Sequence, residues 1–195
     1  MADEPISIVD YQPRWPAEFA AAGARLRQAF GPLALVIRHI GSTSVSGLAA
    51  KDVIDLQVTV AALDPLASLE AAIVAAGCRM RPDIQNDHIP EGADPDPARW
   101  RKRYARELDG QRRTHIHIRV QGLPNERYPV LFRDYLRANA GAMGSYALIK
   151  RELAKRHADD VDAYYDIKDP VMDLIMDAAE RWAQQIGWIL PGSDA

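Results

Sequence analysis

The sequence has little cysteine, no strong charge bias and no long apolar run, and each shortage excludes a class of protein. A single cysteine, Cys78, cannot form an intramolecular disulfide or a cysteine-cluster zinc site, and it suits a reducing compartment. With 24 basic and 27 acidic residues the formal charge is −3, which gives no global argument for binding nucleic acid or an anionic membrane. No stretch approaches the roughly 18 apolar residues of a membrane span, and the first residues do not resemble a secretory signal. We therefore expect a cytoplasmic protein without a membrane partner.

The overall composition is that of an ordinary folded domain. The 195 residues are 48% hydrophobic and 26% charged, which allows one large domain or a core with a helical appendage. Proline and glycine divide the chain into alternating strand and helix patterns. We predict strands at 6–9, 33–40, 53–60, 99–108 and 111–120, and helices at 16–30, 64–77, 126–138, 142–157 and 160–186, the last of them broken near 169–170.

These elements predict an α+β (α/β) fold. It consists of a mixed sheet core over 1–122, with helices on one face, and a helical C-terminal part over 123–195 packed on it as one compact unit. Asp109-Gly110 indicates a hairpin between the last two strands. The acidic, proline-containing segment 83–96 is interpreted as a mobile solvated loop.

Two predicted strands alternate strictly between apolar and polar residues, which places their polar side chains on one face. In the strand 53–60 this face carries Asp55 and Gln57. In the strand 111–120 it carries His115, His117 and Arg119. A polar, histidine-bearing sheet face is therefore expected beside an apolar face that packs under helices.

The loop that leaves the strand 33–40 begins Gly41-Ser42 and precedes Asp55 by twelve intervening residues. Glycine tolerates positive φ and has no side chain, so backbone amides and the Ser42 hydroxyl can approach a phosphate. Asp55 can then hold a divalent metal ion that bridges phosphates. The structural alternative is an ordinary turn with a capping serine.

This spacing resembles the nucleotidyltransferase superfamily, in which a Gly-Ser pair precedes an Asp-x-Asp or Asp-x-Glu strand. Here Gln57 occupies the second acidic position. A more specific resemblance, to the GrpB family, spans nearly the whole chain from Tyr11 to Trp182. It rests on the stretches His39-Ile40-Gly41-Ser42-Thr43-Ser44-Val45, Gly47-Leu48-Ala49-Ala50-Lys51, Ile54-Asp55, Phe132-Arg133-Asp134-Tyr135-Leu136-Arg137 and Tyr146-Ala147-Leu148-Ile149-Lys150. Ser46 and Asp52 stand where that family commonly has proline.

The resemblance implies a nucleotidyltransferase-like sheet with a helical C-terminal part, and it does not fix an activity. Domains of this family also occur as accessory modules fused to dephospho-CoA kinase. This chain lacks the Gly-x-x-x-x-Gly-Lys-Ser/Thr phosphate loop of such a kinase, so the resemblance leads us to expect the accessory part alone.

The histidines suggest a metal site. His115 and His117 project from the same strand face, and together with Asp55 they can form an Asp-His-His site. His39 ends the strand that leads into the Gly41-Ser42 loop. The alternative is that these histidines are hydrogen bonded to neighbours on a polar sheet face. Mg²⁺ or Mn²⁺ is the cofactor expected at Asp55.

Basic residues complete a candidate phosphate site. Two Tyr-x-x-x-Lys pairs, ending at Lys150 and Lys168, each place a ring and an ammonium one helical turn apart. Ordinary surface contacts and a salt-bridged hairpin are the alternatives. The residues predicted to bind phosphate are Gly41, Ser42, Thr43, Ser44, Lys51, Arg101, Arg119, Lys150 and Lys168. We expect the loop, the Asp55 strand and the His117–Arg119 face to converge on one cleft closed by the C-terminal helices.

Three functions fit these residues. The first is a metal-dependent nucleotidyltransferase with Asp55 as the catalytic, metal-binding carboxylate of a degenerate two-metal site. The second is a non-catalytic module that binds a nucleotide or a phosphorylated small molecule. The third is a metal-dependent hydrolase that uses His39, Asp55, His115 and His117. Nucleic acid is not indicated as a partner, and no motif identifies the base, the acceptor or the oligomeric state.

Overall fold

The structure, a computed structural model, describes residues 5–195, which contain a five-stranded mixed sheet. Its strands are β1 (Val36–Ile40), β2 (Ile54–Val60), β3 (Cys78–Met80), β4 (Lys102–Glu107) and β5 (Thr114–Val120), arranged in the order β1-β2-β5-β4-β3. The central pair β2 and β5 is parallel, and the other neighbouring pairs are antiparallel. The predicted mixed sheet is confirmed.

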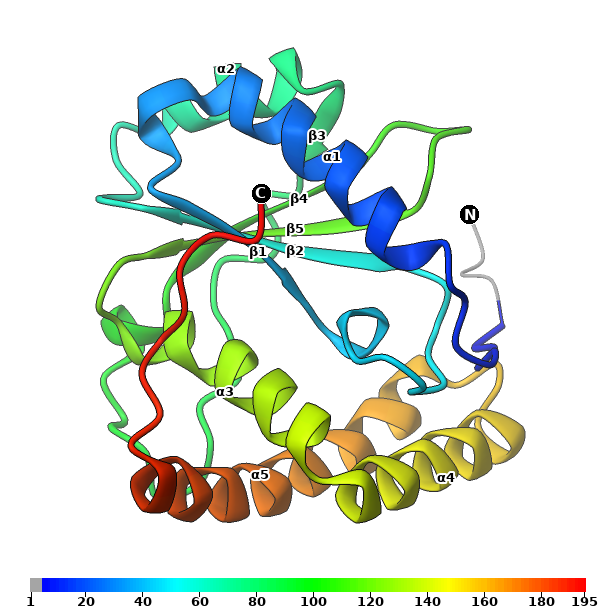
Figure 1. The fold of residues 1–195 in the computed structure, drawn as a ribbon. Coiled ribbons are helices and arrows are strands. Elements are labelled where there is room, and N and C mark those ends of the chain that lie inside the picture. The colour runs from blue at the N-terminus through cyan, green and yellow to red at the C-terminus, as the bar shows by residue number, and fades with distance from the viewer. Residues whose placement is uncertain (1–4) are drawn as a thin grey trace.

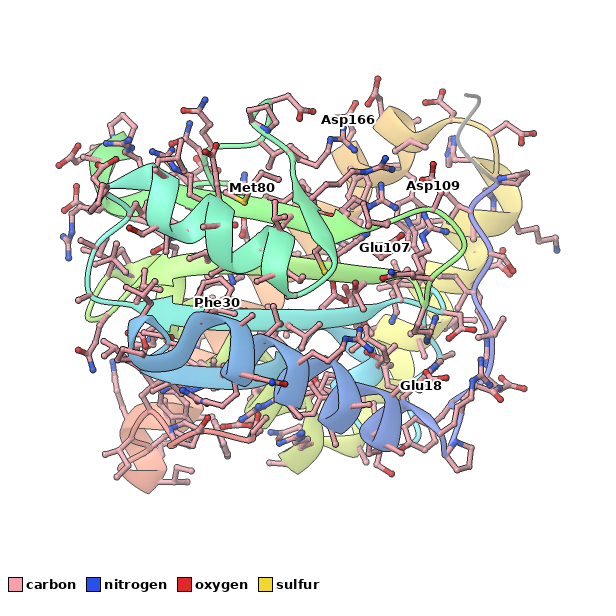
Figure 2. The ribbon with its side chains drawn as sticks, turned by 90° about the horizontal axis from the view of Figure 1, so that it is seen from above. Glu18, Phe30, Met80, Glu107, Asp109 and Asp166 are labelled. Carbon is pink, nitrogen blue, oxygen red and sulfur yellow. The ribbon has the colours of Figure 1, made fainter. Side chains whose placement is uncertain are left out.

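Helices cover both faces of the sheet (Figure 1). One face carries α1 (Trp15–Phe30) and α2 (Leu66–Ala75), which lie over the strands when seen from above (Figure 2). The helical part, α3 (Pro124–Ala138), α4 (Ala140–Arg156) and α5 (Val161–Ile186), lies on the other side. The predicted helical C-terminal part is therefore present, and it faces the sheet opposite α1 and α2.

The main hydrophobic core lies between the sheet and α1 and α2. The apolar face of β2 contributes Ile54, Leu56 and Val58, all fully buried, and α1 contributes Trp15 and Phe30. Burying one large apolar side chain contributes about 1.5–3 kcal/mol, so this core fixes which face of β2 turns inward. Strict alternation then leaves the polar face of β2 toward the helical part.

A second apolar cluster joins the helical part to the loop that follows β1. Leu131 of α3, Tyr146 of α4 and Met176 of α5 pack together with Val45 and Leu48 of the loop. The loop after β1 is therefore part of the interface between the sheet and the C-terminal helices.

Several predicted elements need correction. The segment 6–9 forms no strand of the sheet, because only an isolated bridge joins Val9 to Ala50. The fifth strand is instead β3. The predicted break near Pro170 is wrong, since α5 runs through this proline without interruption. The predicted hairpin is confirmed, because β4 pairs antiparallel with β5 across the turn that contains Gly110.

The last residues return to the sheet and cover the outer edge of β1 (Figure 1). The Asp194 N–H donates to Ile37 O at 2.8 Å, and the His39 N–H donates to Asp194 Oδ2 at 2.9 Å. Ser193 Oγ also bonds the Ile37 backbone. These contacts occupy backbone N–H and C=O groups of β1 that could otherwise pair with another strand. Among residues 5–195, no helix has the length and apolar character needed to cross a membrane.

Candidate functional site

A cleft of about 380 Å³ lies between the polar face of the sheet and the helical part. Its floor comes from β2 and β5, whose register sets Asp55 beside His115 and Gln57 beside His117. Its wall comes from α3, α4 and α5, together with Lys51 of the loop before β2. Most of the predicted site residues line it, namely Gly41, Ser42, Thr43, Lys51, Asp55, His115, His117, Arg119, Lys150 and Lys168.

The turn that follows β1 lies directly against the floor of the cleft. Gly41 has φ +69° and ψ −178°, a conformation that is essentially restricted to glycine. A Cβ at this position would fall 2.3 Å from Asp55 Oδ2. The absence of a side chain at Gly41 is therefore what lets the turn and the Asp55 carboxylate approach each other.

The hydroxyl groups of Thr43 and Ser44 stabilise the turn itself. Thr43 Oγ1 donates to Val53 O at 3.1 Å, and Ser44 Oγ donates to Gly41 O at 2.5 Å. Ser44 does not line the cleft. Ser42 is different, because its hydroxyl lies at the cleft wall, where it accepts a hydrogen bond from Lys150 Nζ at 2.8 Å.

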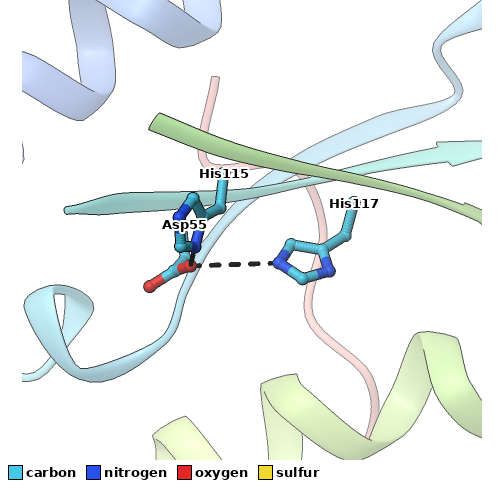
Figure 3. Close-up of side chains that lie close together, drawn as sticks. All are labelled: Asp55, His115 and His117. Carbon is cyan, nitrogen blue, oxygen red and sulfur yellow. Dashed lines mark hydrogen bonds and ion pairs between the residues drawn. The ribbon is translucent and has the colours of Figure 1, made fainter. Parts of the chain in front are cut away.

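Two histidines of β5, His115 and His117, lie beside Asp55 (Figure 3). His115 Nδ1 lies 3.2 Å and His117 Nε2 lies 3.9 Å from Asp55 Oδ1. Burial would raise the pKa of Asp55, but the hydrogen bond with His115 and the nearby His117 outweigh burial and lower it. Asp55 is therefore an ionised carboxylate at neutral pH.

His117 is a neutral imidazole. Burial, followed by the charges of Arg119 and Lys102, lowers the pKa of His117 to about 3. Its Nδ1 faces Arg119 Nη2 at 3.3 Å and Lys102 Nζ at 3.5 Å, and both of these groups can only donate. Nδ1 therefore acts as the acceptor, and Nε2 carries the proton toward Asp55.

A buried ionic network closes one end of the cleft. Asp87 accepts hydrogen bonds from Arg119 Nε and Nη2, both at 2.8 Å, and from Lys102 Nζ at 2.6 Å. Asn125 Nδ2 adds a fourth donor at 3.1 Å. Burial opposes ionisation of Asp87, but the nearby Arg119 and Lys102 lower its pKa strongly. The expectation that 83–96 is a mobile solvated loop is wrong at this residue.

This network changes the roles open to two predicted phosphate ligands. Arg119 is 5% exposed, and its donors are already directed to Asp87, Gln57 and His117. Arg119 therefore positions these three neighbouring side chains. Arg101 is exposed and does not line the cleft. In the predicted strand 99–108, Lys102 faces the cleft, because it lies opposite Arg119 in the β4–β5 register.

The wall opposite Asp55 carries three lysines set against tyrosine rings. Lys51 Nζ lies 4.4 Å from the ring centre of Tyr164 and 4.7 Å from that of Tyr165. Lys168 Nζ lies 5.0 Å from the Tyr165 ring, and Lys150 Nζ lies 4.6 Å from that of Tyr146. Lys168 also donates to Asp169 Oδ1 at 2.8 Å. Such contacts direct the ammonium groups while leaving their charge available to an anion.

Gln57 cannot replace the missing second acid. Its Nε2 donates to Glu126 O at 3.0 Å, and its Oε1 accepts from Arg119 Nη1 at 2.8 Å. The side chain is fully buried, so both ends of the amide are engaged. A pair of magnesium ions needs several oxygen ligands, and Asp55 is the only carboxylate in the Asp55-His115-His117 cluster. These residues do not fit a two-metal centre.

A single metal ion fits better. Asp55, His115 and His117 offer ligand atoms that lie within 4.8 Å of one another. The proton on His117 Nε2 must leave before this nitrogen can bind a metal ion, whereas Asp55 is ready to bind one. One divalent ion on Asp55, completed by ligand oxygens, is the arrangement that these side chains can support.

His39 does not belong to this cluster. It pairs with Leu56 rather than with a cleft-facing residue, and its ring stacks on Phe19 of α1 with ring centres 4.5 Å apart. Its Nε2 lies 3.1 Å from Thr43 Oγ1. Burial lowers the pKa of His39 to about 4. The expectation that His39 joins a metal site is wrong, because strand alternation turns it to the opposite face.

Comparison with known proteins agrees with this architecture. The family model described as GrpB protein matches residues 5–178. The chain belongs to the GrpB family. GrpB from Enterococcus faecalis, known from a crystal structure, is 30% identical, with a TM-score of 0.70 over 90% of this chain and 99% of that one. A cytoplasmic RNA terminal U-transferase has a TM-score of 0.50 at 19% identity, over 76% of this chain and 43% of that one. The nucleotidyltransferase-like fold expected from the sequence is confirmed.

Relatives of this GrpB chain include longer proteins. The dephospho-CoA kinase of Mycolicibacterium paratuberculosis is 36% identical over 200 residues, which cover 96% of this chain and 49% of that protein. The chain thus spans about half the length of the first curated relatives that it matches. The expected relationship between this family and dephospho-CoA kinases is confirmed at the level of sequence.

Proposed function

We propose that the cleft binds a nucleotide or another phosphorylated small molecule, with a phosphate group between the Gly41-Ser42 turn and the lysines of the wall. The observation that carries this proposal is the state of Lys150. Its side chain is 2% exposed, and its Nζ donates to Ser42 Oγ and to Ala49 O at 2.6 Å. Within residues 5–195 no carboxylate forms an ion pair with it.

A buried ammonium without a counterion is costly, so its position at a cleft wall favours an anionic ligand. Burial, followed by the charge of Lys168, lowers the pKa of Lys150 to about 7. The Asp55 carboxylate acts in the opposite direction without pairing with Lys150, so a bound phosphate group would supply a direct counterion and keep Lys150 protonated. Ser42 lies beside it and can share the same phosphate oxygen.

The charge of the whole cleft supports the same ligand class. Its cationic residues are Lys51, Lys102, Arg119, Lys150 and Lys168, and its carboxylates are Asp55, Asp87 and Asp169. The cations exceed the carboxylates by two. A volume of about 380 Å³ is within the usual range for small-molecule sites, and it leaves room for an organic group beyond the phosphates.

Asp55 would hold one divalent cation, Mg²⁺ or Mn²⁺, beside the phosphate groups. When bound, such an ion supplies charge neutralisation to the phosphate oxygens. Asp55 supplies an ionised oxygen, and His115 fixes the carboxylate through its Nδ1. His117 presents its Nε2–H to the same carboxylate.

Nucleotidyl transfer is the second candidate function. It is favoured by the contact between ionised Asp55 and the Gly41 turn, since both would adjoin a reacting phosphate. The engaged amide of Gln57 weighs against it, because only one carboxylate remains for metal. We therefore infer a binding module as the primary role. Release of pyrophosphate from nucleoside triphosphates with covalent attachment of the nucleotidyl group to an acceptor, both lost in Asp55→Asn, would establish transfer instead.

Calorimetric titration of the whole chain with inorganic tripolyphosphate and with ATP tests the binding proposal. The variant Lys150→Met keeps the length of the side chain and removes its charge. The matched control is Lys155→Met, an exposed lysine of the same helix. We expect wild type and the control to bind one ligand per chain, and Lys150→Met to bind at least tenfold more weakly. Equal affinity in all three proteins would contradict the proposed site.

A further inference from the structure

Two arginines of α3 donate hydrogen bonds to backbone carbonyls at the two ends of the Gly41–Ser44 turn. This turn lies at the edge of the cleft floor. Arg137 donates to Ser44 O through Nε at 3.1 Å and through Nη2 at 2.7 Å. Arg133 donates to His39 O through Nη1 at 2.8 Å. Both lie in the Phe132–Arg137 stretch, and neither lines the cleft.

The contact with Arg137 satisfies a carbonyl that has little access to water. Ser44 is 7% exposed, and its carbonyl ends a single helical turn closed by the bond from Ser44 N–H to Gly41 O at 3.2 Å. Two N–H donors of one guanidinium on the same carbonyl form a directional, charge-assisted contact. Arg137 therefore fixes the position of the turn's last residue.

The contact with Arg133 fixes the start of the turn. The Arg133 side chain is 2% exposed, and it bonds Asp134 Oδ1 at 2.8 Å and Asp194 Oδ2 at 2.7 Å as well as His39 O. Asp194 Oδ2 in turn accepts from the His39 N–H. The residue that precedes Ile40 and Gly41 is thus held through both of its backbone polar groups.

We propose that Arg137 and Arg133 are positioning residues that hold the Gly41–Ser44 turn in the shape required to bind a phosphate group. This inference rests on the proposed function of the cleft. The turn lies close against the Asp55 carboxylate, since a Cβ at Gly41 would lie 2.3 Å from Asp55 Oδ2. A small displacement of either end would move Ser42 away from Lys150 or press Gly41 against Asp55.

The proposal gives the helical part a second role. Besides closing the cleft, it holds the loop at three points, through Arg133 at His39 O, Lys150 at Ser42 Oγ and Arg137 at Ser44 O. Only Lys150 among these can touch a ligand in the cleft. The two arginines act through the backbone of the turn.

The experiment compares Arg137→Ala, Arg137→Lys and the control Arg181→Ala, an exposed arginine paired with Asp177 on α5. Arg137 is chosen because its side chain is 43% exposed, which makes the variant tolerable for folding. Hydrogen exchange measures the amides of residues 41–45 against those of β2 and β5. Titration with inorganic tripolyphosphate measures affinity.

In Arg137→Ala we expect exchange at residues 41–45 to rise while β2 and β5 stay protected, and affinity to fall on the order of tenfold. Arg137→Lys should give intermediate values, because lysine retains the charge and offers no planar fork. Unchanged exchange at residues 41–45 in Arg137→Ala would overturn the positioning role, whatever the affinity. Wild-type protein that fails to bind tripolyphosphate would overturn the proposed function, and the exchange data would still decide the role of Arg137.

Discussion

Gly41 and Asp55 are in contact across the floor of the cleft, because a Cβ on Gly41 would lie 2.3 Å from Asp55 Oδ2. The contact joins a turn that follows β1 to a side chain of β2. It explains why a residue without a side chain is required beside the ionised carboxylate.

Gly41→Ala should therefore destabilise the protein and disable the cleft. The substitution adds steric overlap with Asp55 to backbone strain, each costing about 1–3 kcal/mol. The control is Gly31→Ala, since Gly31 also has positive φ, +51°, and a Cβ added there would meet no atom within 4 Å. Urea denaturation should show a clearly larger loss for Gly41→Ala. Equal losses would mean that the contact with Asp55 costs nothing.

Asp87→Asn should be strongly destabilising, because it leaves Arg119 and Lys102 buried without their counterion. Removing one partner of a buried ion pair costs about 3–5 kcal/mol. Asp83→Asn, in the same loop but with an exposed partner, Arg81, is the control and should have no measurable effect. If both variants unfold at the same urea concentration, the network around Asp87 does not support the fold.

The pKa of Asp87 predicts how the stability of the protein changes at acid pH. Its pKa is lowered in the folded protein, so the stability that it contributes is present above its unfolded pKa and is lost as the pH falls. Asp87→Asn should therefore show a shallower loss of stability than wild type below about pH 4. Parallel acid unfolding curves for the two proteins would contradict this assignment.

Phosphate binding should weaken as the pH rises above neutrality. The pKa of Lys150 is lowered to about 7, mainly by burial and by the charge of Lys168. Anions favour the protonated form, so affinity for tripolyphosphate should fall between about pH 6.5 and 8.5, with proton uptake on binding above about pH 7. The histidines His39 and His117 stay neutral throughout, because their pKa values are about 4 and about 3.

Lys150→Met identifies the group responsible for this pH dependence. In that variant the affinity should be lower and nearly constant over the same range, apart from titration of the ligand itself. Calorimetry in two buffers of different ionisation enthalpy measures the proton uptake. Uptake that persists unchanged in Lys150→Met would assign the titration to another residue.

The metal stoichiometry should be one divalent ion per chain or none. Asp55 is the single carboxylate of the cluster, and both ends of the Gln57 amide are engaged. Titration with Mn²⁺ in the presence of a non-hydrolysable nucleoside triphosphate measures the number of ions. Two strong sites would contradict the geometry derived for Gln57. Elemental analysis returning one zinc or nickel per chain, lost in His117→Ala, would instead favour a histidine-metal site.

The sequence was sufficient to place the main polar face of the cleft. Alternation in β2 and β5 sets Asp55, His115 and His117 on one side, because the opposite residues are apolar and bury under α1 and α2. The Gly41-Ser42 turn could also be located, since small residues follow a β-branched strand. The resemblance to the GrpB family supplied the fold.

Other features depend on contacts between distant segments and could not be predicted. Asp87 lies in a stretch that has the composition of a solvated loop, yet its side chain is only 15% exposed and pairs with Lys102 and Arg119. His39 has a suitable residue type for a metal site, but the β1 register turns it toward Phe19. Pro170 lies within α5 and is exposed, so the local preference of proline to end a helix did not predict the observed continuation.

A crystal structure of the protein soaked with tripolyphosphate would show directly whether the cleft binds phosphate. We predict a phosphate group within hydrogen-bond distance of both Ser42 Oγ and Lys150 Nζ, with the remaining phosphates toward Lys51 or Lys168. Tripolyphosphate bound elsewhere on the surface, with Lys150 still bonded only to Ser42 and Ala49, would contradict it.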